Sequence, residues 1–390
     1  MQAQGHGGLR VARIEQESEL VALKAAWAAM LAESEHVSVF LTWEWIAAWW
    51  RHREQDWPLW LLTAWDEEGG LAGVAPLMLV EDRQRPLRVR RLVFLGDRFT
   101  TRNHQDFVAR ERDRSAVAAA FLAYLRSRRR AWDVLDLEGL VASSAVTPLL
   151  GAGLGLHLAR EGVRCPFIAL PPTWQDYEQG MLSANRRQQV RRRLRSLEHD
   201  FVGQVAFEQV TTPAGLGGAL DRLIELTQER WHERGLASSF DGDCFVDFNR
   251  EFAALALANG WLRLYLLRVG GQVIAVDYNF LYRGVFSNYK KGFDLAWERY
   301  SPGQIMQAYL IRKAIEDGAT EFDMLQGPHP YKYSWTAQER VDGHPVVSSD
   351  LPGHVYLLRG ALFDAALAAG RKLVPGELRD RLNVMLAPKA

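Results

Sequence analysis

Two side chains between residues 320 and 335 have the chemistry for proton transfer. His329 stands between two prolines, and an imidazole titrates near neutral pH, which suits a general base. Asp323 lies near the end of the expected strand 320–325, where a carboxylate serves as a base or orients a cation. A histidine in a surface turn and an aspartate that caps a strand explain the same pattern without any catalytic role. We expect acid–base chemistry here, with His329 as the first candidate and Asp323 as the second.

A second candidate feature is the turn that opens the segment 303–317. Ser301, Pro302 and Gly303 precede a run that is apolar on nearly every side, which predicts a buried helix with a fixed N-terminus. Such an N-terminus presents free N–H groups and a partial positive charge, and Gly303 has no Cβ to keep an anion away. The turn therefore suits a pyrophosphate, although an ordinary capped helix has the same sequence pattern.

Polar residues also interrupt two segments that otherwise read as strands. Asp277 and Asn279 lie within the apolar run 272–282, where a buried polar side chain needs a partner, and a substrate would be one. Lys290 and Lys291 end the next strand beside Gly292, so we expect one to bind phosphate and the other to be solvated.

An arginine-rich helix is expected after Pro171-Pro172, in the stretch 185–198. Its apolar residues form one narrow stripe, and six arginines, Arg191 among them, cover the remaining faces. A solvated basic surface explains the pattern. An anion-binding helix also does, because the planar guanidinium fork binds two phosphate oxygens at once.

These residues sit in an element order that occurs twice. The second half predicts helices over 214–234 and 244–259, strands over 261–269, 272–282 and 284–293, a helix after Gly303 and a strand over 320–325. The first half predicts helices over 14–32 and 41–52, strands over 59–66, 71–80 and 90–96, a helix over 115–130 and a strand over 132–140. Glu68-Gly69-Gly70 and Gly270-Gly271 supply the hairpin turns in matching places. The tail 348–390 predicts a strand-like piece, HVYLLRG, and an amphipathic helix.

Composition excludes several protein classes. The 390 residues suit two domains, and 47 basic residues balance 47 acidic ones, which argues against a general nucleic-acid binder. Two cysteines fit a reducing compartment, and neither an apolar leader nor an apolar run of about 20 residues appears, so we expect a cytoplasmic protein. The ten histidines give no metal-ligand spacing, and no Gly-x-Ser-x-Gly hydrolase motif occurs, so we expect no metal.

The arrangement resembles the GCN5-related N-acyltransferase (GNAT) superfamily. It resembles more specifically the CelD/BcsL-like acetyltransferases associated with cellulose biosynthesis, which are related to the Fem peptidyltransferases. The resemblance covers roughly residues 20–345, and its motifs here are FLTWEWIAAWW (40–50), NRRQQVRRRLRSLE (185–198), YKKGFD (289–294), YSPG (300–303) and FDMLQGPHPYKYSW (322–335).

The resemblance implies an α/β (α+β) fold of two tandem GNAT-like domains, each a mixed, largely antiparallel sheet flanked by helices. Residues 1–170 would form a domain degenerate for cofactor, because the stretch 96–107 lacks the phosphate-type glycine. Residues 171–347 would form the acyltransferase domain that begins with the arginine-rich helix, and 348–390 a strand and helix tail. The turn carries one glycine where the superfamily signature, Arg/Gln-x-x-Gly-x-Gly/Ala, has two, and His329 stands near a position that is commonly acidic.

The resemblance also implies roles for the candidates. An acyl-CoA, such as acetyl-CoA, would be the co-substrate, held by residues around the turn: Lys290, Lys291, Tyr300, Ser301, Gly303 and Gln304. His329 or Asp323 would take the acceptor's proton, and Tyr331 or Tyr333 would protonate the leaving thiolate, although aromatic packing also explains these tyrosines. The acceptor, an amine or hydroxyl of a polar metabolite or polysaccharide precursor, would contact Asp277, Asn279, Arg191, Lys332 and Trp335.

Two other functions fit the sequence. A Fem-type transferase would take an aminoacyl group from tRNA, which the arginine-rich helix favours and the lack of a long heptad pair disfavours. A non-catalytic ligand-binding protein on the same fold would tolerate the single-glycine turn. Composition gives no sign of a DNA partner, and the sequence does not indicate an oligomeric state.

Overall fold

The chain divides into two compact units in the computed structural model, which describes residues 4–6, 8–35, 37–55, 57–84, 87–96, 103–151 and 154–373. Unit 1 comprises Met1–Val37, Asp56–Gly162 and Gly343–Ala390, and unit 2 comprises Ser38–Gln55 and Val163–Asp342. The chain passes between the units at four places: before and after the segment 38–55, and within the two long strands β9 (Leu156–Ala169) and β15 (Glu339–Ser348). The sequence predicted neither of these long strands.

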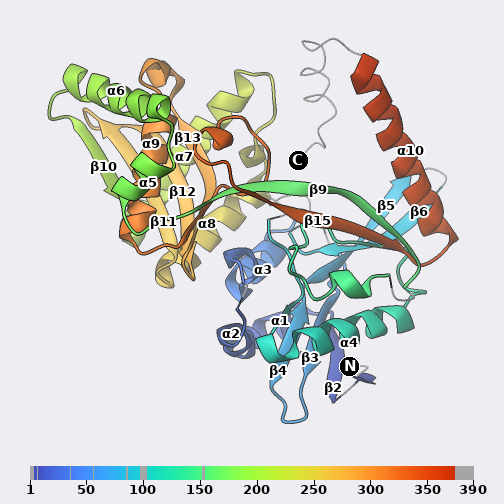
Figure 1. Ribbon diagram of the computed structural model, residues 1–390. Helices are drawn as coiled ribbons and strands as arrows, with labels where there is room; N and C mark the ends of the chain where they lie inside the picture. Colours follow the sequence, from blue (N-terminus) through green and yellow to red (C-terminus); the bar gives the residue numbers. More distant parts are fainter. Residues whose placement is uncertain are drawn as a thin grey trace. The chain divides into compact units, whose positions relative to one another are not determined.

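Unit 2 is built on a mixed sheet in the order β10-β11-β12-β13-β14-β9 (Figure 1). Its strands are β10 (Val205–Gln209), β11 (Leu262–Val269), β12 (Gln272–Tyr282), β13 (Val285–Phe293) and β14 (Glu321–Asp323), together with the C-terminal part of β9. Neighbouring strands are antiparallel except for β13 and β14, which are parallel. A parallel pair needs a crossover, and helix α9 (Pro302–Glu316) provides it.

Helices cover both faces of this sheet. On one face lie α7 (Pro213–His232) and α8 (Asp243–Ala258), with Leu226 of α7 packed so closely on Gly292 that a Cβ there would lie 2.8 Å from it. On the other face lies α9, whose apolar side shares a core with Phe286 and Phe322. The helices α5 (Trp174–Gly180) and α6 (Ala184–Asp200) pack on α9 (Figure 1). The result is a three-layer unit whose central strands are buried on both sides.

The segment 38–55 also belongs to unit 2. Its helix α3 (Trp43–Arg51) is capped by Thr42, whose hydroxyl accepts from the Trp45 backbone N–H. The fully buried ring of Trp45 makes edge-on contacts with Phe248 and Phe252 of α8, at 4.9 and 4.7 Å between centroids. Burying such a ring contributes about 2–3 kcal/mol, so the tryptophan-rich motif of residues 40–50 anchors this segment on α8.

Unit 1 contains the same order of elements. One sheet has the order β1-β2-β3-β4-β7, with strands Gln4–His6, Leu9–Ile14, Leu61–Trp65, Leu71–Ala75 and Val108–Ala109. In a second group β5 (Leu77–Gln84) is antiparallel to β6 (Leu87–Phe94), β6 is parallel to β8 (Val134–Asp136), and β8 is antiparallel to the end of β15. The helices are α1 (Glu17–Ala22), α2 (Lys24–Ala32), α4 (Arg114–Ser127) and α10 (Leu351–Leu373).

Each unit thus has antiparallel strands, then a parallel pair joined through a helix: β13, α9 and β14 in unit 2, and β6, α4 and β8 in unit 1. This repeat of element order confirms the expected fold class of mixed, largely antiparallel sheets flanked by helices. None of the helices in the described part of the chain is long and apolar enough to cross a membrane.

The expected strand HVYLLRG is wrong, because these residues lie within α10. Asp350 explains the difference: its carboxylate accepts from the Gly353 N–H at 3.0 Å, and its carbonyl accepts from the His354 N–H at 2.9 Å. This cap, with Pro352 in the first turn, favours a helix over the strand that the run of apolar residues predicted. The expected strand 71–80 is also interrupted, since Pro76 separates β4 from β5. Residues 374–390 of the expected tail and 97–102 of the stretch 96–107 lie outside the described residues.

Candidate functional site

The N-terminus of α9 is uncapped and strained. Ser301 at the cap position has φ 55° and ψ 58°, a left-handed conformation that costs a serine roughly 1–2 kcal/mol, and its side chain makes no capping hydrogen bond. Pro302 has no N–H, and the Gly303 N–H makes no hydrogen bond with the described residues. The first turn of this helix therefore keeps an open backbone donor.

The fold does not require glycine at position 303. Gly303 lies within the helix and is not among the residues with positive φ. A Cβ added there would meet the Phe293 ring at 3.4 Å, which is ordinary contact. Glycine in a helix costs about 1 kcal/mol relative to alanine, so its presence points to a need for open space at the backbone.

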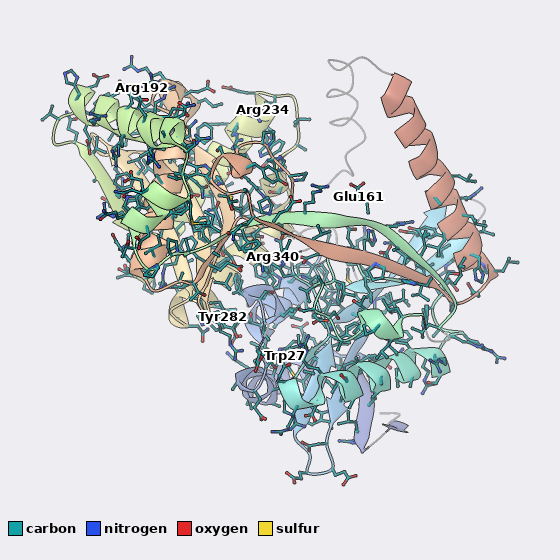
Figure 2. The ribbon with its side chains drawn as sticks, viewed as in Figure 1. Trp27, Glu161, Arg192, Arg234, Tyr282 and Arg340 are labelled. Carbon is teal, nitrogen blue, oxygen red and sulfur yellow. The ribbon has the colours of Figure 1, made fainter. Side chains whose placement is uncertain are left out.

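Arginines of α6 reach the same turn. Arg186 donates to Gln304 Oε1 at 3.1 Å and lies over the Trp335 ring, 5.1 Å from its centroid. Arg193 donates to the Arg299 carbonyl at 2.6 Å, just before the turn. Two of the six arginines therefore place positive charge beside the N-terminus of α9. Figure 2 labels Arg192, which is exposed on α6.

Other predicted residues near the turn already have protein partners. Arg191 forms an exposed salt bridge with Glu178 of α5, at 2.7 Å. The Tyr300 hydroxyl lies 2.7 Å from Asp200 Oδ2 and also contacts Arg299, so its tip faces α6. Trp335 is buried in the core, where its carbonyl accepts from the Tyr177 hydroxyl at 2.9 Å.

A buried polar network crosses β12, β13 and α9. Lys291 Nζ donates to Asn288 Oδ1 at 2.8 Å and to Gln307 Oε1 at 2.9 Å. Asn288 Nδ2 in turn donates to Asn279 Oδ1 at 2.7 Å and contacts Asp277 Oδ1 at 3.4 Å. Burial raises the pKa of Asp277 to about 6, although Lys291, its register partner, and Asn288 act in the opposite direction.

A β-bulge assembles this network. The β12–β13 register shifts between Tyr278 and Phe280, so that one extra residue of β13 is accommodated opposite β12. Asn288 and Lys291 are three apart, and in a regular strand they would point to opposite faces. With the bulge, both hydrogen-bond on the α9 side of the sheet.

Lys290 points to the other face. Its Nζ lies 3.4 Å from the Ser239 hydroxyl and 5.0 Å from the centroid of the Phe245 ring, on the α8 side. Burial lowers the pKa of Lys290 to about 8. The two adjacent lysines are therefore separated by the sheet, and Lys291 alone joins the network.

The parallel pairing of β13 with β14 is short. It covers only Val285–Ser287 against Glu321–Asp323, after which β13 continues to Phe293 and the chain leaves β14. Asp323 is buried, and its Oδ1 accepts from the Leu325 N–H at 2.8 Å, which supports Leu325 at φ 59°. Lys332 is also buried and donates to the carbonyls of Leu325 and Gln326, at 2.9 and 2.7 Å. Burial and Lys291 lower the pKa of Lys332 to about 8.

The segment 327–331 carries His329 and Tyr331 at the surface. Gly327 has φ 102°, and a Cβ there would come within 2.9 Å of His329 Nε2, so the imidazole lies directly against this glycine. The His329 and Tyr331 rings are nearly parallel, 6.2 Å apart, and Lys291 Nζ lies 5.0 Å from the Tyr331 centroid. Crowding by protein atoms, with Lys332, Arg230 and Lys291 nearby, lowers the pKa of His329. The imidazole is therefore largely neutral at pH 7.

The structure thus brings one group of predicted residues together: Asp277, Asn279, Lys291, Asp323, His329, Tyr331 and Lys332. Ser301, Gly303 and Gln304 lie at the turn of α9, while Lys290, Arg191, Tyr300 and Trp335 have other surroundings. Sequence reasoning missed Asn288 and Gln307, although a polar residue in an apolar element was the signal used for Asp277. It also missed Arg230, which has no such signal.

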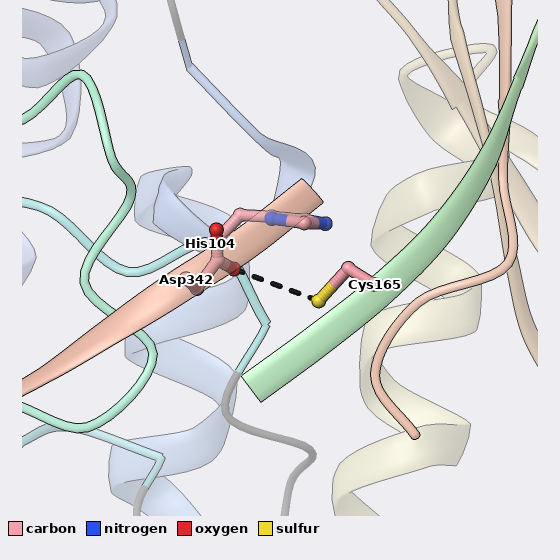
Figure 3. Close-up of side chains that lie close together, drawn as sticks. All are labelled: His104, Cys165 and Asp342. Atoms are coloured by element: carbon pink, nitrogen blue, oxygen red, sulfur yellow. Dashed lines mark hydrogen bonds between the residues drawn. The ribbon is translucent and has the colours of Figure 1, made fainter. Parts of the chain in front are cut away.

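Cys165 of β9 lies beside Asp342 of β15. Its buried thiol lies 3.7 Å from Asp342 Oδ2 (Figure 3). Burial, together with Asp342 and Asp323, raises its pKa, so the thiol stays protonated and is a poor nucleophile.

Comparisons with known proteins agree with this geometry. The sequence profile of the family described as "Acetyltransferase (GNAT) domain" matches residues 184–333, from the start of α6 to Tyr333. No curated protein matches the sequence significantly.

Several solved structures share the fold. The crystal structure of FemX is similar with a TM-score of 0.60 and 11% identity, over 89% of this chain and 99% of that one. The C-terminal domain of a putative lysylphosphatidylglycerol synthetase from Agrobacterium fabrum has a TM-score of 0.54 and 11% identity, over 89% of this chain and 96% of that one. L-PGS from Bacillus licheniformis has a TM-score of 0.52 and 13% identity, over 88% of this chain and 96% of that one. At such low identity these similarities concern the fold alone. The profile match shows a GNAT acetyltransferase domain at residues 184–333, and this domain makes the chain an acyltransferase. The solved structures agree with it in fold.

Proposed function

We propose that the protein transfers an acyl group from an acyl-CoA to an amine or hydroxyl of a polar metabolite or polysaccharide precursor. The observation that carries this proposal is the uncapped N-terminus of α9, where Ser301 is strained and Gly303 is required by neither backbone nor packing. A helix that leaves such a donor open suits a pyrophosphate. Arg186 and Arg193 add positive charge there.

The acyl thioester would supply the activated carbonyl, and the chain's own groups would handle the protons. His329 takes the proton of the attacking amine or hydroxyl, because its lowered pKa keeps the imidazole neutral at pH 7. Tyr331, stacked beside it, is positioned to give a proton to the departing sulfur. Asp323 and Lys332 hold the segment that carries both rings.

Transfer is proposed to be direct, without a covalent enzyme intermediate. Cys165 is buried with a raised pKa, which fits this proposal. Asp277 and Asn279 are proposed to face the acceptor side of the network rather than the phosphates. Residues 1–170 are proposed to have lost cofactor binding, and the motifs of residues 40–50, 185–198 and 322–335 support a CelD/BcsL-like relationship.

Transfer of an aminoacyl group from tRNA is the second candidate. Arg192 and Arg195, exposed on α6, favour it, because neither forms an ion pair with the described residues and exposed basic side chains attract a phosphate backbone. Arg186, Arg191 and Arg193 have protein partners, which reduces the basic surface available to a nucleic acid.

Thermal-shift binding separates these functions. The proposal predicts that acetyl-CoA or a longer acyl-CoA raises the melting temperature and that bulk tRNA does not. Stabilisation by tRNA alone, lost when Arg191, Arg192 and Arg193 are changed to Glu, would favour the second candidate. Absence of any response would leave a non-catalytic binding protein.

A further inference from the structure

Arg230, near the C-terminus of α7, is a half-buried cation without a counter-ion. Its guanidinium lies over the Phe293 ring, 4.9 Å from the centroid. It makes no hydrogen bond or ion pair with any residue that the structure describes, and its Nε is shielded from water without a partner. Burying an N–H that makes no hydrogen bond costs free energy, so we expect a ligand to accept a hydrogen bond from it.

Several other arginines of unit 2 form ion pairs with carboxylates. Arg222, two turns earlier on α7, binds Glu225 and Asp294. Arg250 binds Asp221, Arg263 binds Asp317 and Arg268 binds Glu208. Arg230 differs from these arginines because its Nε is buried and no carboxylate of the described residues lies beside it.

The surroundings of Arg230 are positively charged. Burial and the neighbouring Arg234, which Figure 2 labels after α7, lower the pKa of Arg230. Arg230, Lys332 and Lys291 all contribute to the lowered pKa of His329. Two buried carboxylates act on the lysines of this group, Asp277 on Lys291 and Asp323 on Lys332. Arg230 is therefore the one of these three cations that has no acidic partner among the described residues.

We propose that Arg230 binds an anionic group of the acceptor, a carboxylate or a phosphate, next to the nucleophile that His329 deprotonates. The inference rests on the proposed acyl transfer and narrows its acceptor to a molecule that carries a negative charge. Phe293 holds the guanidinium from one side, and its Cδ1 and Cε1 edge faces Gly303. The planar fork, fixed on an aromatic ring, suits two oxygens of one anion.

The alternative source of the anion is the acyl-CoA itself, whose phosphates would lie at the turn of α9. Two observations favour the acceptor. The turn already has Arg186 and Arg193 of α6 beside it. Arg230, in contrast, lies within electrostatic range of both His329 and Tyr331, so we place it with the proton-transfer residues.

His329 supplies a direct readout, because an anion at Arg230 raises the pKa of a neighbouring imidazole. We would titrate the His329 ring protons by NMR in the full-length protein, assigned with His329→Gln. The probes are inorganic phosphate and acetate, each compared with chloride at equal ionic strength and each repeated with CoA at saturation. We expect at least one probe to raise the pKa of His329 by on the order of 0.5 pH unit, both with and without CoA. The probe that acts tells a phosphate acceptor from a carboxylate acceptor.

Variants assign the shift to one side chain. It should disappear in Arg230→Gln, persist in Arg230→Lys and persist in Arg250→Gln, which removes a surface arginine of the same unit. Melting temperatures of each variant show that it is folded.

The acceptor site is contradicted if neither anion changes the pKa of His329, or if the pKa shift persists in Arg230→Gln. It is also contradicted if CoA at saturation abolishes the pKa shift, a result that would assign Arg230 to the cofactor. The same samples report whether CoA binds at all, by thermal shift. If it does not, the proposed function fails and the acceptor assignment fails with it. A protein that binds CoA but shows no anion shift contradicts the acceptor site alone.

Discussion

Lys291 Nζ lies 2.9 Å from Gln307 Oε1, and this hydrogen bond joins strand β13 to helix α9 inside the acetyltransferase domain. An ammonium group has only donors, so the contact fixes the Gln307 amide with its oxygen toward the lysine. The same ammonium is 5.0 Å from the Tyr331 centroid. Lys291 therefore links the helix that begins at the Ser301 turn to the segment that carries His329 and Tyr331.

Lys291→Met should lower the free energy of unfolding by about 2–3 kcal/mol. The variant removes the ammonium that donates to the buried Asn288 and Gln307 and that interacts electrostatically with the buried Asp277. Urea denaturation measures this loss. Lys313→Met on the outer side of α9, where the lysine has only helical partners at Glu316 and Asp317, should cost less than about 1 kcal/mol. Equal losses in the two variants would show that the network does not stabilise the domain.

Asp277 should make the folded state less stable as pH rises through the window from about 4 to 6. Its pKa is about 6 in the folded protein against 3.8 unperturbed, so the folded state holds a proton that the unfolded state has released. The penalty reaches at most about 3 kcal/mol above that window.

Asp277→Asn should therefore gain stability relative to the wild type between pH 4.5 and pH 7, measured by urea denaturation at both values. Asp221→Asn, at a surface pair with Arg250, is the control and should show no such gain. A constant difference between Asp277→Asn and the wild type at the two pH values would contradict the buried, proton-holding carboxylate.

His329→Gln should lower the rate of CoA thiol release in the presence of an acceptor about 100-fold. In the wild type, kcat/KM should fall as pH drops through a value below the ordinary histidine pKa of 6.5, because His329 has a lowered pKa and must be neutral to accept a proton. The variant should lack this acidic limb. An unchanged limb in a folded His329→Gln protein would remove His329 from the mechanism.

Gly327→Ala should impair the same step without touching any reacting group. The glycine has φ 102°, and a methyl group would come within 2.9 Å of His329 Nε2, so the imidazole must move. We expect kcat to fall more than about tenfold, with little change in acyl-CoA affinity. Gly318→Ala, at a positive-φ glycine with open space around it, controls for backbone strain. Loss of acyl-CoA binding in Gly327→Ala, with kcat preserved, would place this glycine in the cofactor site.

Elements with a strong local signal were predictable from the sequence. The strands β11, β12 and β13 and the helices α7, α8 and α9 lie within two residues of their expected ranges, because hairpin glycines and apolar periodicity mark their ends. The long strands β9 and β15 were not predicted, since polar residues interrupt their apolar pattern and their pairing is entirely non-local.

The candidate site was predictable only in part, for a similar reason. Asp277 and Lys291 stand out as polar residues in strands, but their partnership depends on the register of β12 and β13 and on the bulge that turns Asn288 to the same face. Lys290 looks identical to Lys291 in sequence, and only the pleat separates them. In the sequence, Arg230 near the end of a helix looks like an ordinary C-terminal cation. Only the structure shows that its buried Nε has no partner.

The central claim, that the turn of α9 receives the phosphates of an acyl-CoA, is tested most directly by calorimetric titration with acetyl-CoA. The wild type should bind, and Gly303→Trp should bind at least tenfold more weakly, a loss of about 1.4 kcal/mol or more, because the indole fills the space in front of the backbone. Gly217→Trp, at an open glycine of α7, should bind as the wild type does. Absence of binding to the wild type, or equal affinity in Gly303→Trp, would contradict the account.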